Sequence, residues 1–166
     1  MAYIATTSGG VPTAVAQPTL TTAFVGAVHV DSPIEVDSLS YRSAGFGSAN
    51  AVMRIAIYTD NGIRIINVTD AIGTGSGQRN VAVSPAAMLA PGNYYFFCCL
   101  ASGDTATNMT LYNTFTLFTS PGAGDFDLEG DHGIAGGNAP SIINFTGITT
   151  PKEDRTLILR LDGVAS

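Results

Sequence analysis

The chain consists of short runs of β-forming residues separated by turn residues, and this pattern constrains its fold more than any other feature. About eight runs rich in Val, Ile, Thr, Tyr or Phe suit a pleated, half-buried surface. The predicted strands cover residues 21–30, 34–44, 50–59, 62–71, 78–84, 92–102, 107–120 and 155–163. Only the segment SPAAMLAPG, residues 84–92, could hold a helical turn.

Alternation within the runs predicts which residues face a core. In VMRIAIYT, the side chains of Met53, Ile55 and Ile57 fall on one face of a strand, because successive side chains point to opposite sides. The run 157–161 alternates in the same way. The sequence therefore predicts an all-β protein, an antiparallel β-sandwich that is jelly-roll-like.

Turn residues join the predicted strands. Asp60-Asn61-Gly62 lies between two runs, and Asn-Gly favours a tight hairpin because both central positions of such a turn accept positive φ. We expect the chain to reverse direction here. The stretch GTGSGQ, residues 73–78, lacks the Lys-Ser/Thr of a phosphate-binding loop and precedes a strand, so we interpret it as an inter-strand loop.

Residues 1–20 differ from the rest of the chain. They contain Thr, Ala, Gly and Pro, they have no helical period, and they lack the basic start and apolar core of a signal peptide. We expect an extended N-terminal arm, either loose or laid across a neighbour. Residues 21–166 are long enough for a single domain with its own core.

Charge and cysteine usage exclude several classes of protein. The formal charge is −6 and the seven basic residues are scattered, which argues against a nucleic-acid partner. No apolar run is long enough to cross a membrane. Cys98 and Cys99 are adjacent, and neighbours in a strand point to opposite faces, so we expect two free thiols and assembly in a reducing cytosol.

A sequence resemblance extends over roughly residues 34–119. The positions Arg54, Ile57, Tyr58, Asp60 and Gly62 are followed by a second group at Leu89, Pro91, Gly92, Tyr94 and Tyr95. This order resembles a jelly-roll module found in virion proteins of tailed bacteriophages. The resemblance implies a virion component, of the capsid-decoration or the tail-fibre and spike type, and it carries no catalytic residues.

The two histidines do not form a catalytic set. His29 lies inside an apolar run, where a packed histidine is expected, and His132 lies in a glycine-rich segment with no nucleophile motif nearby. We therefore predict no enzyme activity, no catalytic residues and no cofactor. A hydrolase acting through the acidic residues would need two carboxylates at a suitable separation, and the sequence does not indicate one.

The acidic stretch GAGDFDLEGDHG, residues 122–133, is the remaining candidate for an ion site. Asp125, Asp127, Glu129 and Asp131 resemble part of a calcium loop, but the twelfth position is Gly136, so the closing glutamate is absent. We predict no metal site and expect a solvated loop. Calcium binding by these four carboxylates stays open.

The aromatic run Tyr94-Tyr95-Phe96-Phe97 places large rings on both faces of one strand. A sugar-binding surface is one interpretation. Burial on both sides is another, with the outer face covered either by a partner subunit or by the chain itself. The first form of burial favours a homo-oligomer.

These features together predict a structural virion protein assembled in the host cytoplasm. We expect a capsid decoration, or cement, protein that forms a homotrimer and binds the major capsid protein or neighbouring virion proteins. The alternative is a receptor- or glycan-binding module of a tail fibre, collar or spike. The position on the particle, the partner and the symmetry of the oligomer are open at this stage.

Overall fold

A computed structural model describes residues 2–6, 13–16, 23–45, 52–71, 77–102, 110–115, 128–130, 139–143, 155–157 and 159–165. The regular structure in these ranges is β-strand throughout. The strands are β1 (Ala2–Thr6), β2 (Thr13–Ala16), β3 (Ala23–Val30), β4 (Ile34–Gly45), β5 (Val52–Thr59), β6 (Arg64–Ala71), β7 (Gly77–Leu89), β8 (Gly92–Ser102), β9 (Thr110–Phe115), β10 (Leu128–Gly130), β11 (Arg155–Leu157) and β12 (Leu159–Ala165).

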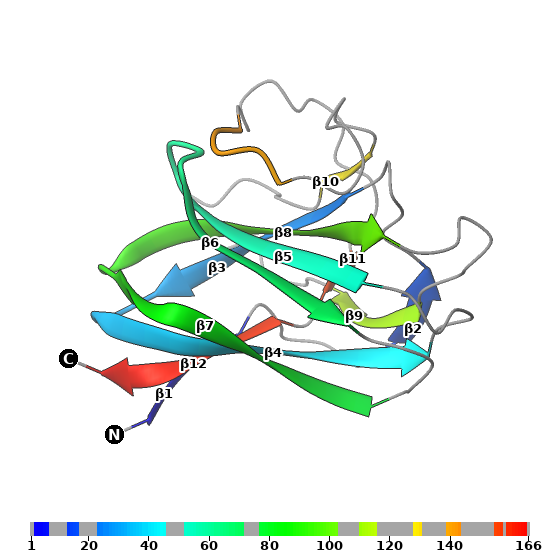
Figure 1. Ribbon diagram of the computed structural model, residues 1–166, viewed down its shortest axis with the longest axis horizontal. Coiled ribbons are helices and arrows are strands. Elements are labelled where there is room, and N and C mark those ends of the chain that lie inside the picture. Colours follow the sequence, from blue (N-terminus) through cyan, green and yellow to red (C-terminus); the bar gives the residue numbers. More distant parts are fainter. Residues whose placement is uncertain are drawn as a thin grey trace.

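The strands form two antiparallel sheets that pack face to face (Figure 1). One sheet has the order β10-β3-β8-β5-β6. In the other, β1 pairs with β12, β12 with β4, and β4 with β7, while β9 extends the far end of β4 and pairs with β2 and β11. The prediction of an all-β antiparallel β-sandwich is confirmed.

The core fills the space between the sheets and follows the predicted alternation. Met53, Ile55 and Ile57 are fully buried in it, as the pattern in β5 predicts. Removing such side chains from water is the main favourable contribution to folding. The cluster comprises Val30, Ile34, Val36, Leu39, Tyr41, Met53, Ile55, Ile57, Ile66, Val81, Val83, Leu89, Tyr94, Phe96, Cys98 and Leu161.

The β5–β6 hairpin forms where the Asp-Asn-Gly sequence predicts it, but the two central residues of its turn lie one position earlier in the chain than expected. The Gly62 amide donates to the Thr59 carbonyl oxygen at 2.9 Å, so Asp60 and Asn61 occupy the centre of the turn. Gly62 follows with φ of 77°. This arrangement matches a three-residue hairpin loop, in which a left-handed residue follows the turn, and it corrects the expectation that Asn61 and Gly62 are the central pair.

Strand β7 is longer than the sequence predicts, and it takes up most of residues 84–92, the segment that could have held a helical turn. The strand continues to Leu89, with Met88 opposite Glu35 of β4. Its pairing with β4 shifts between Val36 and Ser38, which lets the chain pass Pro85 without losing the strand. Because β7 pairs with β4 alone among the described strands, it is an edge strand, where proline is tolerated.

Two described segments fall within residues 1–20. Strand β1 pairs with β12, with Ala2 opposite Val164, and β2 pairs with β9, with Thr13 opposite Asn113. Both segments are extended and both pair within the chain. The role of residues 1–20 as an arm toward a neighbour stays a prediction, as does the single-domain boundary at residue 21.

Candidate functional site

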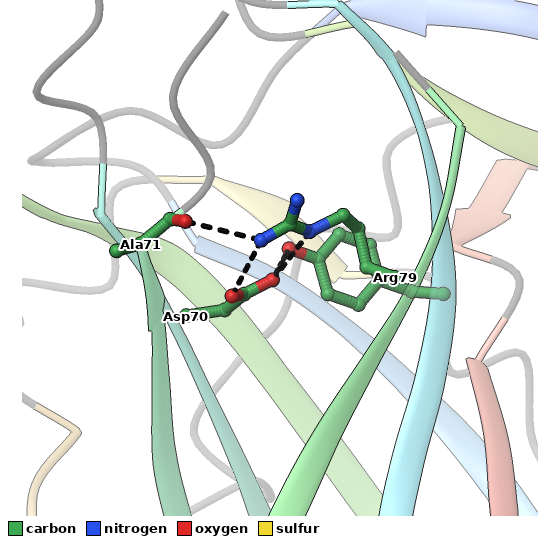
Figure 2. Close-up of polar contacts among 4 residues, drawn as sticks. Asp70, Ala71 and Arg79 are labelled. Carbon is green, nitrogen blue, oxygen red and sulfur yellow. Dashed lines mark hydrogen bonds and ion pairs between the residues drawn. The ribbon is translucent and has the colours of Figure 1, made fainter. Parts of the chain in front are cut away.

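A polar cluster at one edge of the sandwich joins the two sheets (Figure 2). The Tyr41 hydroxyl of β4 donates to Asp70 Oδ2 of β6 at 2.7 Å. Arg79 of β7 binds the same carboxylate with two nitrogens, Nε to Oδ2 at 2.9 Å and Nη2 to Oδ1 at 2.8 Å. Arg79 Nη2 also donates to the carbonyl oxygen of Ala71 at 3.0 Å. One carboxylate therefore connects three strands from both sheets.

Strand alternation explains why these residues meet. Ile66, Val68 and Asp70 occupy alternate positions of β6, so Asp70 continues the face that packs on the core. Arg79 precedes Val81 and Val83 in the same way on β7. β6 and β7 are edge strands of opposite sheets, and two inward-facing groups of opposite charge pair across the gap between them.

The surroundings keep each member of the cluster in one protonation state at neutral pH. Burial and the hydrogen bond to Asp70 raise the pKa of the Tyr41 hydroxyl well above its usual value, so it stays protonated. Burial alone would raise the pKa of Asp70, but the hydrogen bonds from Arg79 and Tyr41 outweigh burial and hold it below its usual value. The hydrogen bonds with Asp70 raise the pKa of Arg79. The carboxylate is ionised and the guanidinium is charged.

This cluster suits structure better than catalysis. A general acid or base works best with a pKa near the operating pH, whereas these pKa values move away from neutrality. The Asp70 and Arg79 side chains are only 14% and 30% exposed, and the bidentate pairing occupies both carboxylate oxygens. Inward-pointing charges on edge strands also oppose pairing with other chains. We interpret the cluster as a lock that joins the sheets.

A second arrangement covers the outer face of the five-stranded sheet. Residues 139–143 lie over the tip of the β5–β6 hairpin (Figure 1). The Tyr58 hydroxyl donates to the Pro140 carbonyl oxygen at 2.8 Å, and Arg64 Nη1 donates to the Ala139 carbonyl oxygen. The Ile143 amide donates to the Gly62 carbonyl oxygen at 2.9 Å. We call Ala139–Ile143 the strap.

Gly62 allows the strap to approach. A Cβ atom at this position would overlap the carbonyl oxygen of Ile143, and the positive φ already favours glycine. Tyr58 and Gly62, two of the positions that carry the sequence resemblance, thus have a structural role in holding the strap.

Burial within the chain accounts for the aromatic run on β8. Tyr94 and Phe96 face the core, as alternation predicts, and Tyr95 and Phe97 on the outer face are also buried within the single chain. The Phe97 ring meets Tyr58 edge-on at 6.3 Å between ring centroids. A partner subunit is therefore not needed to explain the apolar outer face, and the exposed rings required by a sugar-binding surface are absent from this run.

The other sequence candidates stay apart or lie outside the described residues. His29 lies in β3 opposite Asn93 of β8. Glu129 lies in β10 opposite Phe24. Asp125, Asp127, Asp131 and His132 lie outside the described residues. Neither Cys98 nor Cys99 is in a disulfide, as the sequence predicts, and both are buried.

Comparison with models of known protein families and with curated protein sequences finds no match. Within the ranges that the structure describes, no three His, Cys, Asp or Glu side chains gather closely enough to hold a metal ion. The same ranges contain no helix that is long and apolar enough to span a membrane.

The cluster of Tyr41, Asp70 and Arg79 was not predicted from the sequence. The sequence does contain an indication of it, because each of two strands has a charged residue at a position that alternation assigns to the core face. Asp70 follows Ile66 and Val68 on one strand, and Arg79 precedes Val81 on the other. The two charges are opposite, which could have indicated a cross-sheet pair.

The buried tyrosines predict a stability profile that falls at alkaline pH. Burial raises the pKa values of Tyr41, Tyr58 and Tyr95 above the value of about 10 in an unfolded chain. Their contribution to the free energy of unfolding is therefore fully present below about pH 10, and it is lost as the pH rises toward the pKa values of the folded protein. Urea unfolding from pH 7 to 11 should show a flat region and then a fall of about 1.4 kcal/mol per pH unit for each tyrosine that stays protonated only when folded.

A control separates this effect from general alkaline damage. Tyr41→Phe should make the fall in the free energy of unfolding above about pH 10 less steep, by about 1.4 kcal/mol per pH unit, because one titrating hydroxyl is removed. An equal slope in Tyr41→Phe and wild type would contradict the assignment to Tyr41.

At acid pH the change in stability with pH has the opposite sign. The lowered pKa of Asp70 contributes stability that is present above about pH 4 and is lost as pH falls through the folded value.

Proposed function

We propose that the protein is a structural virion protein of jelly-roll topology, and specifically a capsid decoration protein that stabilises the head shell of a tailed bacteriophage. It works by binding and carries out no reaction. Its partners are the major capsid protein or neighbouring virion proteins, and it acts as a homotrimer on the assembled particle.

The strand order is the observation that carries the jelly-roll part of this proposal. If β1, β3, β4, β5, β6, β7, β8 and β12 are numbered one to eight along the chain, the two sheets have the orders 1-8-3-6 and 2-7-4-5. The chain crosses between the sheets repeatedly, as in two interleaved Greek keys. This topology agrees with the fold implied by the sequence resemblance.

The roles of the motif residues support a binding function without chemistry. Tyr58 and Gly62 hold the strap, and Tyr94 lies in the core. In the polar cluster, Tyr41 and Arg79 both donate hydrogen bonds to the Asp70 carboxylate, and these bonds join the two sheets. Such a module offers rigid surfaces, which suits a protein that holds other subunits in place.

Decoration would combine a rigid body with an extended segment. The sandwich would sit on the shell, and residues 1–20 would lie as an arm in grooves between shell subunits and add main-chain hydrogen bonds. A trimer attaches at several points, so modest contacts would add up to firm attachment. In the single chain β1 and β2 pair with β12 and β9, so this role requires both segments to leave those pairings on the particle.

Copy number in purified particles tests the proposal. Quantitative mass spectrometry should find hundreds of copies per virion, which is the number that decoration of a head shell requires. A dozen copies or fewer would favour the alternative, a collar, tail-fibre or spike component. Absence from purified virions would overturn the virion role altogether.

A further inference from the structure

The tip of the β5–β6 hairpin carries a chemically labile pair of residues. Asn61 is the only Asn in the sequence that precedes a Gly, and its side chain is exposed. A glycine after Asn leaves the next main-chain nitrogen unhindered and lets the backbone adopt the angles that bring this nitrogen to the side-chain carbonyl carbon. Asn is also counted among the thermolabile residues of proteins. Asn61 is therefore the asparagine of this chain that is most prone to lose its side-chain amide.

The reaction that this pair favours is deamidation through a cyclic imide. The Gly62 amide nitrogen forms a bond to the side-chain carbonyl carbon of Asn61 and gives up its proton, and the side-chain nitrogen leaves as ammonia. Water then opens the ring at either carbonyl, which leaves aspartate or isoaspartate at position 61. Asparagine and water give an acid and ammonia, so the step needs no oxidant and no cofactor.

The folded hairpin restrains this reaction at the attacking nitrogen. The Gly62 amide donates its proton to the Thr59 carbonyl oxygen at 2.9 Å, and the Gly62 carbonyl oxygen accepts from the Ile143 amide of the strap at 2.9 Å. The Thr59 amide closes the same turn by donating to the Ile63 carbonyl oxygen at 2.9 Å. These bonds fix the peptide between residues 61 and 62, so the nitrogen is released to react only when the turn opens locally.

We propose that Asn61 is a deamidation site of the folded protein, and that the turn and the strap together set its rate. The product with the larger structural effect is isoaspartate, because it puts an extra methylene group into the main chain of residue 61. Gly62 has no room to move toward the strap, since even a Cβ atom there would overlap the Ile143 carbonyl oxygen. The modification therefore weakens the bonds that hold the strap over Tyr58. This inference concerns the chemical lifetime of the fold and does not depend on the virion role.

The test follows deamidation of the full-length protein in mildly alkaline buffer by peptide mapping. Trypsin releases residues 55–64, in which Asn61 is the only Asn, and residues 65–79, in which Asn67 is the only Asn. The mass increase from amide to acid should accumulate at Asn61 and stay undetected at Asn67, which is also exposed but precedes Val68.

A synthetic peptide of residues 55–64 measures the restraint that the fold imposes. It should deamidate at least about tenfold faster than the folded chain, because the hydrogen bonds of the turn must first break in the protein. An equal rate in the peptide and the folded chain would overturn the proposed restraint. No conversion at Asn61 in the folded chain, under conditions that convert the peptide completely, would overturn the modification site itself.

Tyr58→Phe shows whether the strap takes part in the restraint. It removes the bond from the Tyr58 hydroxyl to the Pro140 carbonyl oxygen and should speed deamidation of Asn61 by about two- to tenfold. Tyr41→Phe is the matched control, because it also removes the hydroxyl of a buried tyrosine, but at the other end of β6, where that hydroxyl donates to Asp70. Equal rates in the two variants would overturn the part assigned to the strap.

Amide hydrogen exchange tests the effect of the product. Asn61→Asp has the charge of the aspartate product without the longer main chain, so its Gly62 and Ile143 amides should stay as protected as in wild type. Aged protein that contains isoaspartate, quantified with an isoaspartate-specific methyltransferase, should lose about tenfold of this protection. Asn61→Gln aged in parallel controls for other damage, because its longer side chain forms the ring far more slowly. Equal protection of the Ile143 amide in the isoaspartate form and in fresh protein would contradict the effect on the strap.

Discussion

Gly163→Ala is expected to lower the free energy of unfolding by about 3 kcal/mol, near the upper end of the cost of overpacking a well-packed site. Gly163 lies opposite an irregularity of β4: Asp162 pairs with Ser38 and Gly163 with Val36, so Asp37 is the extra residue. A Cβ there would overlap the carbonyl oxygen of Glu35 and would lie 3.0 Å from the Cα of Val36. These are main-chain atoms of β4, which is paired with β12 on one side and with β7 on the other, so they have little freedom to move.

Urea unfolding followed by circular dichroism measures this effect, with Val164→Ala as the matched control. Val164 is the next residue on the same strand and is 52% exposed, so its truncation should change stability by less than about 0.5 kcal/mol. A Gly163→Ala variant as stable as the control would show that the register of β12 against β4 at the bulge is wrong.

Asp70→Ala is expected to destabilise the fold by about 2–3 kcal/mol, because it leaves Arg79 and the Tyr41 hydroxyl without their shared partner. The Tyr41 side chain is 2% exposed and cannot recover its hydrogen bond from water without rearrangement. The partial exposure of Arg79 keeps the loss below that of a fully buried ion pair.

A double-mutant cycle separates the ion pair from simple loss of packing. Arg79→Met in the Asp70→Ala background should cost less than Arg79→Met in wild type, because no carboxylate is left unpaired. Asp37→Ala is the control: this carboxylate is exposed, and its removal should change stability by less than about 0.5 kcal/mol. Additive effects of the Asp70 and Arg79 substitutions would show that the two side chains do not interact in solution.

Most strands and core faces could be predicted from the sequence because alternation is a local property. The positions Met53, Ile55 and Ile57 show period two in the sequence, and the same period places them on one side of β5. The strand β7 was predicted too short, because Pro85 indicates a break and the compensating bulge depends on the pairing with β4.

The candidate sites were less accessible to sequence analysis because each depends on residues distant in the chain. The Tyr41 hydroxyl meets a carboxylate 29 positions away, and the Tyr58 hydroxyl meets a carbonyl 82 positions away. Local periodicity contains no information on such pairings. The four carboxylates of the acidic stretch are close in the sequence, which by itself does not bring their oxygens together around an ion.

The sequence by itself determined the all-β class, the inward faces of the central strands and the position of the β5–β6 hairpin, because each follows from side-chain period or turn chemistry over a few residues. Only the tertiary structure decided which edge strands lie opposite each other, and hence that Asp70 and Arg79 form a lock. It also decided that the strap, and not a second subunit, covers Tyr58 within one chain. The physical reason is that strand pairing and sheet packing are chosen by the whole chain at once, whereas alternation is set residue by residue.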